Sequence, residues 1–200
     1  MEMNSVVEPV AKKQNPTKLA LVDAAERSIL KNGYKAMSFR DLAEEVGIKS
    51  ASVHYHFPTK GDLVAQVMRR YREDFAERLT LPKKKRSAAQ KALNKFIDGF
   101  KAQVVDQDNM SICTILMAEK SLLEEEAKAE VAAFYDLKLE WLSTVVSYMS
   151  QEWITSEEAQ SYACQILASL HGASVVVKAT GNPELFEHAV APWRDLSSRF

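Results

Sequence analysis

Glycine and proline are scarce in this sequence of 200 residues, with only six of each. No alternating valine-rich runs are bounded by these turn-forming residues, which argues against strands and for an all-α fold. Hydrophobic residues make up 46% of the chain and charged residues 26%. That balance is sufficient for one or two compact domains with cores of their own.

Features of secreted, membrane-bound and catalytic proteins are also few. The chain has two cysteines, no secretory signal and no apolar run of about 18 residues. We therefore expect a cytoplasmic protein without disulfides or membrane association. Because it lacks a glycine-rich phosphate loop, a serine elbow and a histidine, cysteine and carboxylate cluster with metal-ligand spacing, we expect no metal, no cofactor and no enzyme. The sequence does not exclude a catalytic triad formed by residues that are far apart in the chain and meet in the fold.

Charge is distributed unevenly along the chain. The net charge of −1 does not by itself suggest a nucleic-acid-binding protein. Residues 1–86, however, hold 17 Lys+Arg against 11 Asp+Glu, a net +6, whereas residues 87–200 hold 9 against 16, a net −7. This asymmetry predicts a basic N-terminal head that contacts nucleic acid and an acidic C-terminal body.

Residues 38–57, SFRDLAEEVGIKSASVHYHF, have the pattern of a helix-turn-helix. Ser38 has the spacing of a helix cap relative to Asp41, and Gly47 suits a left-handed residue at the end of the first helix. The second helix is expected to expose a polar set consisting of Lys49, Ser50, Ser52, His54 and Tyr55. Such a surface suits the phosphates and base edges of DNA. A surface hairpin whose polar residues are merely solvated is the alternative.

The segments around this stretch predict further elements. An amphipathic helix from Thr17 ends at Gly33. Thr59 and Asp62 form a capping box at the start of a long helix, where free amides beside Lys60 make a natural phosphate site. Residues 1–15 lack periodicity and predict a disordered arm, and residues 81–86, LPKKKR, predict a linker.

The run from Thr17 to about Leu79, with AAERSILKNGYKAMSFRDLAEEVGIKSASVHYHFPTKGDL at its centre, resembles the N-terminal DNA-binding domain of the TetR family of bacterial transcriptional repressors. The resemblance implies a three-helix helix-turn-helix domain over residues 16–80 and a helical ligand-binding and dimerisation domain over residues 87–200. DNA contacts are then expected from Ser38, Lys49, Ser50, Ser52, His54, Tyr55, Thr59 and Lys60. The family commonly has a small hydroxyl residue at Lys49, a glycine at Ala51 and an aromatic at His54, so these departures leave the base preference open.

The function implied by the resemblance is that of a ligand- or stress-responsive repressor. It would bind a palindromic operator in double-stranded DNA as a homodimer and be released by a small-molecule inducer that the sequence does not identify. The alternative is a helical small-molecule-binding protein, or an enzyme, without specific DNA binding. The salt dependence of duplex binding distinguishes the repressor from this alternative. Binding through several Lys and Arg contacts to phosphates weakens steeply as the salt concentration rises.

Two C-terminal helices, over residues 156–179 and 183–199, are expected to form the dimer interface. The first has a broad small-and-aliphatic face, and Val175 and Val176 add apolar surface outside it. In the family layout both helices pack against their copies, and a palindromic operator needs two heads about 34–36 Å apart, or a multiple of that distance. A buried core helix of a monomer is the alternative.

The second helical domain is predicted to begin at a capping box formed by Ser87 and Gln90. Its inward side chains are mostly aromatic or sulfur-containing, which suits a pocket for a flat or apolar ligand and equally an ordinary core. The candidate lining residues are Phe96, Phe100, Met110, Cys113, Met117, Phe134, Trp141 and His171.

Cys113 lies in a segment, SICTILMAEKSLLEEEAKAEV, that resembles a subgroup of TetR-family repressors sensing electrophiles or oxidants through a cysteine. A nearby helix N-terminus and Lys120 favour a reactive thiol. The opposing interpretation is that Cys113 is a small buried hydrophobe, as cysteine usually is.

Overall fold

The computed structural model describes residues 15–151 and 153–200, and all regular structure in these residues is helical. The all-α prediction is therefore confirmed. The described helices are α1 (Pro16–Ala36), α2 (Phe39–Val46), α3 (Ser50–His56), α4 (Lys60–Arg78), α5 (Arg86–Lys101), α6 (Ile112–Ala118), α7 (Glu125–Ser150), α8 (Ser156–Thr180) and α9 (Glu184–Arg194). The same described residues also form three short helical turns, η1 (Ala102–Asp106), η2 (Lys120–Leu122) and η3 (Leu196–Arg199).

The predicted N-terminal arm, residues 1–15, lies outside the described residues except for Asn15. The Asn15 side chain accepts a hydrogen bond from the backbone amide of Thr17 at 2.9 Å. This contact caps α1, which begins at Pro16, where the missing amide hydrogen is harmless.

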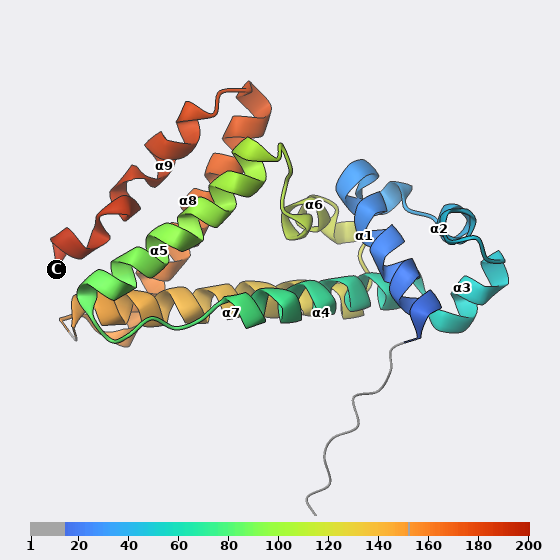
Figure 1. The fold of residues 1–200 in the computed structure, drawn as a ribbon, viewed down its shortest axis with the longest axis horizontal. Helices are drawn as coiled ribbons and strands as arrows, with labels where there is room; N and C mark the ends of the chain where they lie inside the picture. Colours follow the sequence, from blue (N-terminus) through green and yellow to red (C-terminus); the bar gives the residue numbers. More distant parts are fainter. Residues whose placement is uncertain (1–14, 152) are drawn as a thin grey trace, which may run out of the picture.

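Helices α1, α2 and α3 form a head at one end of the molecule together with the first turns of α4 (Figure 1). The Ser38 hydroxyl accepts a hydrogen bond from the Asp41 amide at 3.2 Å and caps α2. Gly47 ends α2 with a φ of 74°, a left-handed conformation that glycine adopts without strain. Leu42 and Val53 are buried, so both short helices turn an apolar side to the interior of the head, where α2 packs against α1 and α3 packs against α2.

Helices α4 and α7 lie side by side along the molecule and join the head to the body (Figure 1). Glu130 on α7 pairs with Arg69 at 2.7 Å and with Arg72 at 3.1 Å. One turn further along, the rings of Phe75 and Phe134 meet edge to face with centroids 5.1 Å apart. Helix α4 therefore belongs to the head at its first turn and to the body at its last.

The buried apolar side chains of residues 15–151 and 153–200 form two hydrophobic clusters. The first unites the head with α6 and the first half of α7, and includes Leu21, Ile112 and Phe134. The second is formed by α5, the second half of α7, α8 and α9. The boundary between residues 16–80 and 87–200 thus stays a prediction, because the packing of the first cluster crosses it.

Candidate functional site

The outward surface of α3 gathers the polar residues that the helix-turn-helix pattern predicted. Lys49, Ser50, His54 and Tyr55 are exposed and Ser52 is half-buried. Tyr55 is 85% exposed, although a phenol of this size is ordinarily buried at least in part. The buried Val53 holds the opposite side of α3 against the head. The arrangement presents hydroxyl, imidazole and phenol groups on one short helix, which is suited to reading DNA.

The start of α4 lies beside this surface. Thr59 accepts a hydrogen bond from the Asp62 amide at 3.0 Å, and the Thr59 amide donates to the Asp62 carboxylate at 3.0 Å. The predicted capping box is therefore confirmed, and Thr59 itself is exposed.

Lys60 is placed differently from the prediction of a phosphate contact. Its ammonium donates to the Tyr34 carbonyl at 2.5 Å and lies 4.0 Å from the centre of the Tyr34 ring. Burial lowers the pKa of Lys60, while the carboxylates of Glu124 and Glu119 oppose that shift. The carbonyl, the ring face and two carboxylates surround this ammonium at the end of α1, and its predicted phosphate contact stays a prediction.

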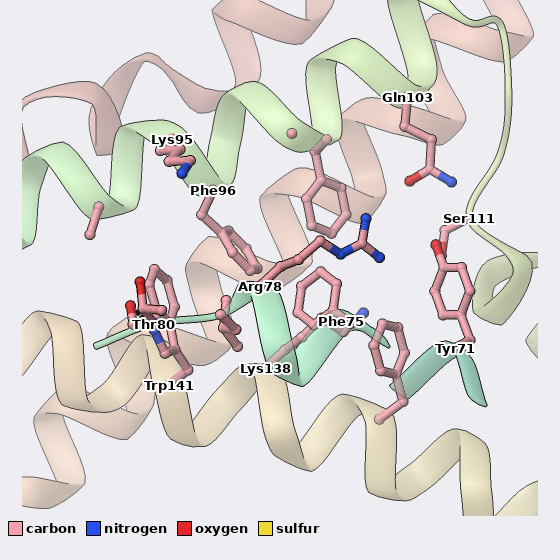
Figure 2. Close-up of a pocket in the computed structure, with 15 residues that line it drawn as sticks. Tyr71, Phe75, Arg78, Thr80, Lys95, Phe96, Gln103, Ser111, Lys138 and Trp141 are labelled. Carbon is pink, nitrogen blue, oxygen red and sulfur yellow. Dashed lines mark hydrogen bonds between the residues drawn. The ribbon is translucent and has the colours of Figure 1, made fainter. Parts of the chain in front are cut away.

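A cavity of about 300 Å³ lies between α4, α5 and α7 in the body (Figure 2). Four of the eight predicted lining residues border it, namely Phe96, Phe100, Phe134 and Trp141. The rings of Phe96 and Trp141 are stacked with centroids 5.2 Å apart. These side chains give the cavity a mainly aromatic wall, as small-molecule sites commonly have.

The other four predicted lining residues lie outside this cavity, so their place in a ligand site stays a prediction. Cys113 is fully buried in the first hydrophobic cluster, because α6 packs against α1. Met117 borders a separate hollow beside Lys120. His171 lies behind Lys138, and Met110 lies in the loop before α6, where its carbonyl accepts from Gln103.

Several lining residues were missed by sequence reasoning. Tyr71, Phe75 and Arg78 come from the last turns of α4 and Leu79 follows its end, and none of the four was among the predicted lining residues. Lys138 was also missed. The sequence contains a signal for it, because Lys138 stands four residues after Phe134 and four before Leu142. This spacing places it on the inward side of α7.

Lys138 is the centre of a buried polar cluster next to the cavity. Its ammonium lies 3.4 Å from Nε2 of His171 and 3.8 Å from the sulfur of Cys113. The sulfur also lies 2.7 Å from the hydroxyl of Ser111, and Nδ1 of His171 lies 2.9 Å from the hydroxyl of Thr114. Burial, followed by the positive charge of Lys138, lowers the pKa of His171 to about 4. The imidazole is therefore neutral at pH 7, and its Nε2 can accept a hydrogen bond from Lys138.

Helix α8 carries a second surface feature. Its solvent-facing side carries a stripe of small and aliphatic residues at intervals of three or four, namely Ser161, Cys164, Ala168, Gly172, Val175 and Val176. The remaining apolar face packs inside the second cluster. Val175 and Val176 are 50% and 44% exposed, as the sequence pattern indicated.

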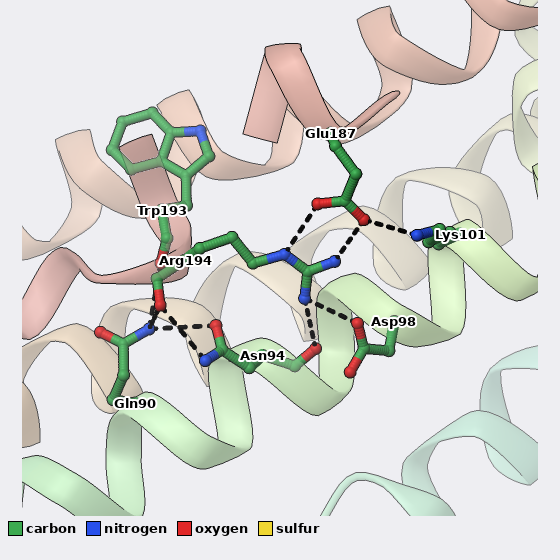
Figure 3. Close-up of polar contacts among 7 residues, drawn as sticks. All are labelled: Gln90, Asn94, Asp98, Lys101, Glu187, Trp193 and Arg194. Carbon is green, nitrogen blue, oxygen red and sulfur yellow. Dashed lines mark hydrogen bonds and ion pairs between the residues drawn. The ribbon is translucent and has the colours of Figure 1, made fainter. Parts of the chain in front are cut away.

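Helix α9 is fixed beside α8 by polar contacts with α5 (Figure 3). Gln90 donates to the carbonyls of Trp193 and Arg194 at 3.0 and 3.1 Å. Arg194 pairs with Asp98 and Glu187 at 2.6 and 2.9 Å.

The predicted capping box formed by Ser87 and Gln90 is wrong. Helix α5 begins at Arg86 without a side-chain cap, and Gln90 satisfies carbonyls at the end of α9 instead.

In the described part of the chain, no helix combines the length and hydrophobicity needed to span a bilayer. Nor do these residues contain a group of three or more histidine, cysteine, aspartate or glutamate side chains placed to hold a metal ion.

Comparison with known proteins agrees with this geometry. Residues 21–67 match the family described as "Bacterial regulatory proteins, tetR family", and residues 89–191 match "Transcriptional regulator LmrA/YxaF-like, C-terminal domain". The fatty acid metabolism regulator protein of Bacillus subtilis (strain 168) is 25% identical over 117 residues, which are 58% of this chain and 60% of that protein. The match thus spans less than two thirds of that relative's length.

Two solved structures resemble almost the whole chain. A TetR transcriptional regulator from Legionella pneumophila is 25% identical with a TM-score of 0.74, covering 94% of this chain and 98% of that one. A TetR-family regulator from Agrobacterium tumefaciens is 26% identical with a TM-score of 0.77, covering 92% and 97%. These relatives are regulators and not enzymes. With its helix-turn-helix head and a C-terminal match over residues 89–191, the chain belongs to the TetR family of bacterial transcriptional regulators.

Proposed function

We propose that the protein is a ligand-responsive repressor that binds a palindromic operator as a homodimer and leaves it when a small molecule enters the cavity. The course of α4 is the observation that carries this proposal. Tyr71, Phe75 and Arg78 of its last turns border the cavity, and its first turn begins beside Thr59 at the DNA-binding surface. A ligand that favours another position of α4 therefore favours another position of the head.

The proposed DNA contacts come from one surface of the head. Ser50, Ser52, His54 and Tyr55 of α3 would enter the major groove. Three residues at helix starts, Ser38, Lys49 and Thr59, would position the head on phosphates. Lys49 supplies the fixed positive charge of this set.

Dimerisation is proposed through α8 and α9. The exposed stripe of small residues on α8 allows two helices to approach closely, and burying Val175 and Val176 removes apolar surface from water. Two heads held in this way match the symmetry of a palindromic operator. Because the proposed partner is bacterial operator DNA, the proposed location of the protein is the cytoplasm.

Selection of bound fragments from the source genome, followed by fluorescence anisotropy on the selected duplex, tests the proposal. We expect duplex affinity to fall steeply with added salt. Tyr55→Ala should lose roughly tenfold or more in affinity while remaining a dimer by sedimentation. Trp153→Ala is the matched control, because Trp153 is 80% exposed and lies outside the head. Absence of salt-sensitive duplex binding would overturn the repressor assignment, and loss of the dimer in Tyr55→Ala would make Tyr55 a structural residue.

A further inference from the structure

The ammonium of Lys138 is buried without an ion pair. Lys138 is 1% exposed, and no carboxylate in the described residues lies within salt-bridge distance of it. Its polar neighbours are a neutral imidazole at 3.4 Å and the Cys113 sulfur at 3.8 Å. The rings of Phe134 and Tyr135 lie 4.2 and 4.4 Å away. Buried lysines are ordinarily paired, since an unpaired charge is costly to remove from water.

Hydrogen-bonding capacity remains on this side chain. An ammonium has three donors, and the two acceptors that contact it, His171 and Cys113, account for two of them. Lys138 also borders the cavity, so its third donor is available to a molecule bound there. Burial lowers the pKa of Lys138, and an anion beside it would favour the charged form again.

The remaining charges of the cavity have the same sign. Arg78 and Lys95 also border it, and no aspartate or glutamate is among its lining residues. Figure 2 shows the Arg78 side chain extending past Phe75 into the cavity. The Arg78 Nε donates to the carbonyl of Asp74 at 2.9 Å, which leaves the guanidinium without a carboxylate partner in the described residues. Positive side chains thus approach the cavity from α4, α5 and α7.

We propose that this cavity binds a compact organic anion, with its carboxylate or similar acidic group between Lys138 and Arg78 and its apolar body against Phe75, Phe96 and Trp141. Two charge-assisted hydrogen bonds would orient the acidic group. A volume of about 300 Å³ is at the lower end of the range for small-molecule sites, which limits the size of the body. The same charges would repel a cationic ligand. The claim that this anion is the inducer of DNA release rests on the proposed function. The claim that it binds in the cavity does not.

A series with one ring system and three charges tests the proposal. 2-Naphthoate, 2-naphthamide and 2-naphthylmethylamine are titrated into the full-length protein at neutral pH by isothermal calorimetry. We expect the carboxylate to bind roughly tenfold or more tightly than the neutral amide, and the amine to bind weakest. Lys138→Met keeps the length of the side chain and should reduce the preference for the carboxylate over the amide to about twofold or less.

Two further variants keep the result interpretable. Arg78→Gln should weaken the binding of 2-naphthoate more than the binding of the amide. This variant keeps the proposal testable even if Lys138→Met fails to fold. Lys91→Met is the matched control, because Lys91 is an exposed lysine of α5 outside the cavity lining, and this variant should behave as wild type. The proposal is overturned if the amide or the amine binds as tightly as the carboxylate, or if none of the three binds. It is also overturned if both Lys138→Met and Arg78→Gln keep the full preference.

Duplex binding without any naphthyl compound is measured on the same samples. Operator binding with no anion preference would refute the anion site and leave the repressor function standing. Anion binding by a protein without duplex affinity would refute the repressor function and leave the anion site standing.

Discussion

The phenol of Tyr34, near the C-terminal end of α1, donates a hydrogen bond to the carboxylate of Glu124, the residue just before α7. The Tyr34 amide donates to Glu119 at 2.6 Å, so two carboxylates of the body hold this segment of the head. Burial, then the contact with Glu124, raises the pKa of Tyr34, which keeps the phenol protonated at all ordinary pH values. Together with the ion pairs of Arg69 and Arg72 with Glu130, these contacts connect the head to the body through polar groups.

Removing the phenol hydroxyl tests that connection. Tyr34→Phe should lower the free energy of unfolding by about 1–2 kcal/mol, because the Glu124 carboxylate loses its donor at a partly buried position. Urea denaturation followed by circular dichroism measures the change. Tyr148→Phe is the matched control, since the half-buried Tyr148 hydroxyl has no hydrogen bond in the described structure. Equal losses in both variants would show that the hydrogen bond to Glu124 contributes nothing specific.

The close approach of α4 to Glu124 gives a second prediction. A Cβ atom added at Gly61 would lie 2.6 Å from Cβ of Glu124, so Gly61→Ala must push the start of α4 away. We expect a loss of about 1–3 kcal/mol in the free energy of unfolding. Gly99→Ala, where nothing lies within 4 Å of the new Cβ, should instead gain about 0.4–1 kcal/mol. A Gly61→Ala variant as stable as wild type would contradict so close a contact between α4 and Glu124.

Acid should destabilise the body through His171. Its pKa is about 4 in the folded protein and 6.5 when unperturbed, so the unfolded chain takes up the proton first as pH falls. The contribution of neutral His171 to the free energy of unfolding is therefore complete above about pH 6.5 and is lost as the pH falls to about 4. The loss amounts to roughly 3 kcal/mol at most. The groups facing the ring are Lys138, Thr114, Phe100 and Tyr135.

Urea midpoints between about pH 7 and pH 5 measure this dependence. His171→Gln should flatten it, whereas the exposed control His188→Gln should keep it. The same slope in His171→Gln as in wild type would assign the acid sensitivity to other groups.

Cys113 gives a prediction about reactivity. The thiol is fully buried, whereas Cys164 is exposed. In a Cys164→Ser background, we expect iodoacetamide to modify Cys113 at least about 100-fold more slowly in the native protein than in urea. Mass spectrometry over time measures both rates. Rapid native modification that also releases the operator would instead support the sensor interpretation, which stays a prediction.

Local signals made the head predictable. The Ser38 and Thr59 caps and the left-handed Gly47 each depend on residues within four positions, so the sequence indicates them directly. The cavity depends on contacts between residues far apart. Phe75, Phe96 and Phe134 come from three different helices, and a one-dimensional pattern does not show that their rings meet. The contact of Lys60 with Tyr34 was not predicted for the same reason, because Tyr34 lies 26 positions earlier.

The position of the cavity at the far end of α4 has a mechanical consequence. Nineteen residues at about 1.5 Å each make α4 a rod of about 28 Å, with aromatic side chains at one end and the DNA-binding surface at the other. A rod of this length converts a small tilt at Phe75 into a larger sweep at α3. In a two-fold pair each head sweeps in the opposite sense, so symmetry doubles the change in their separation. An operator with half-sites about 34–36 Å apart would therefore bind the dimer with tilted α4 helices more weakly, because the separation of its heads no longer matches the half-sites.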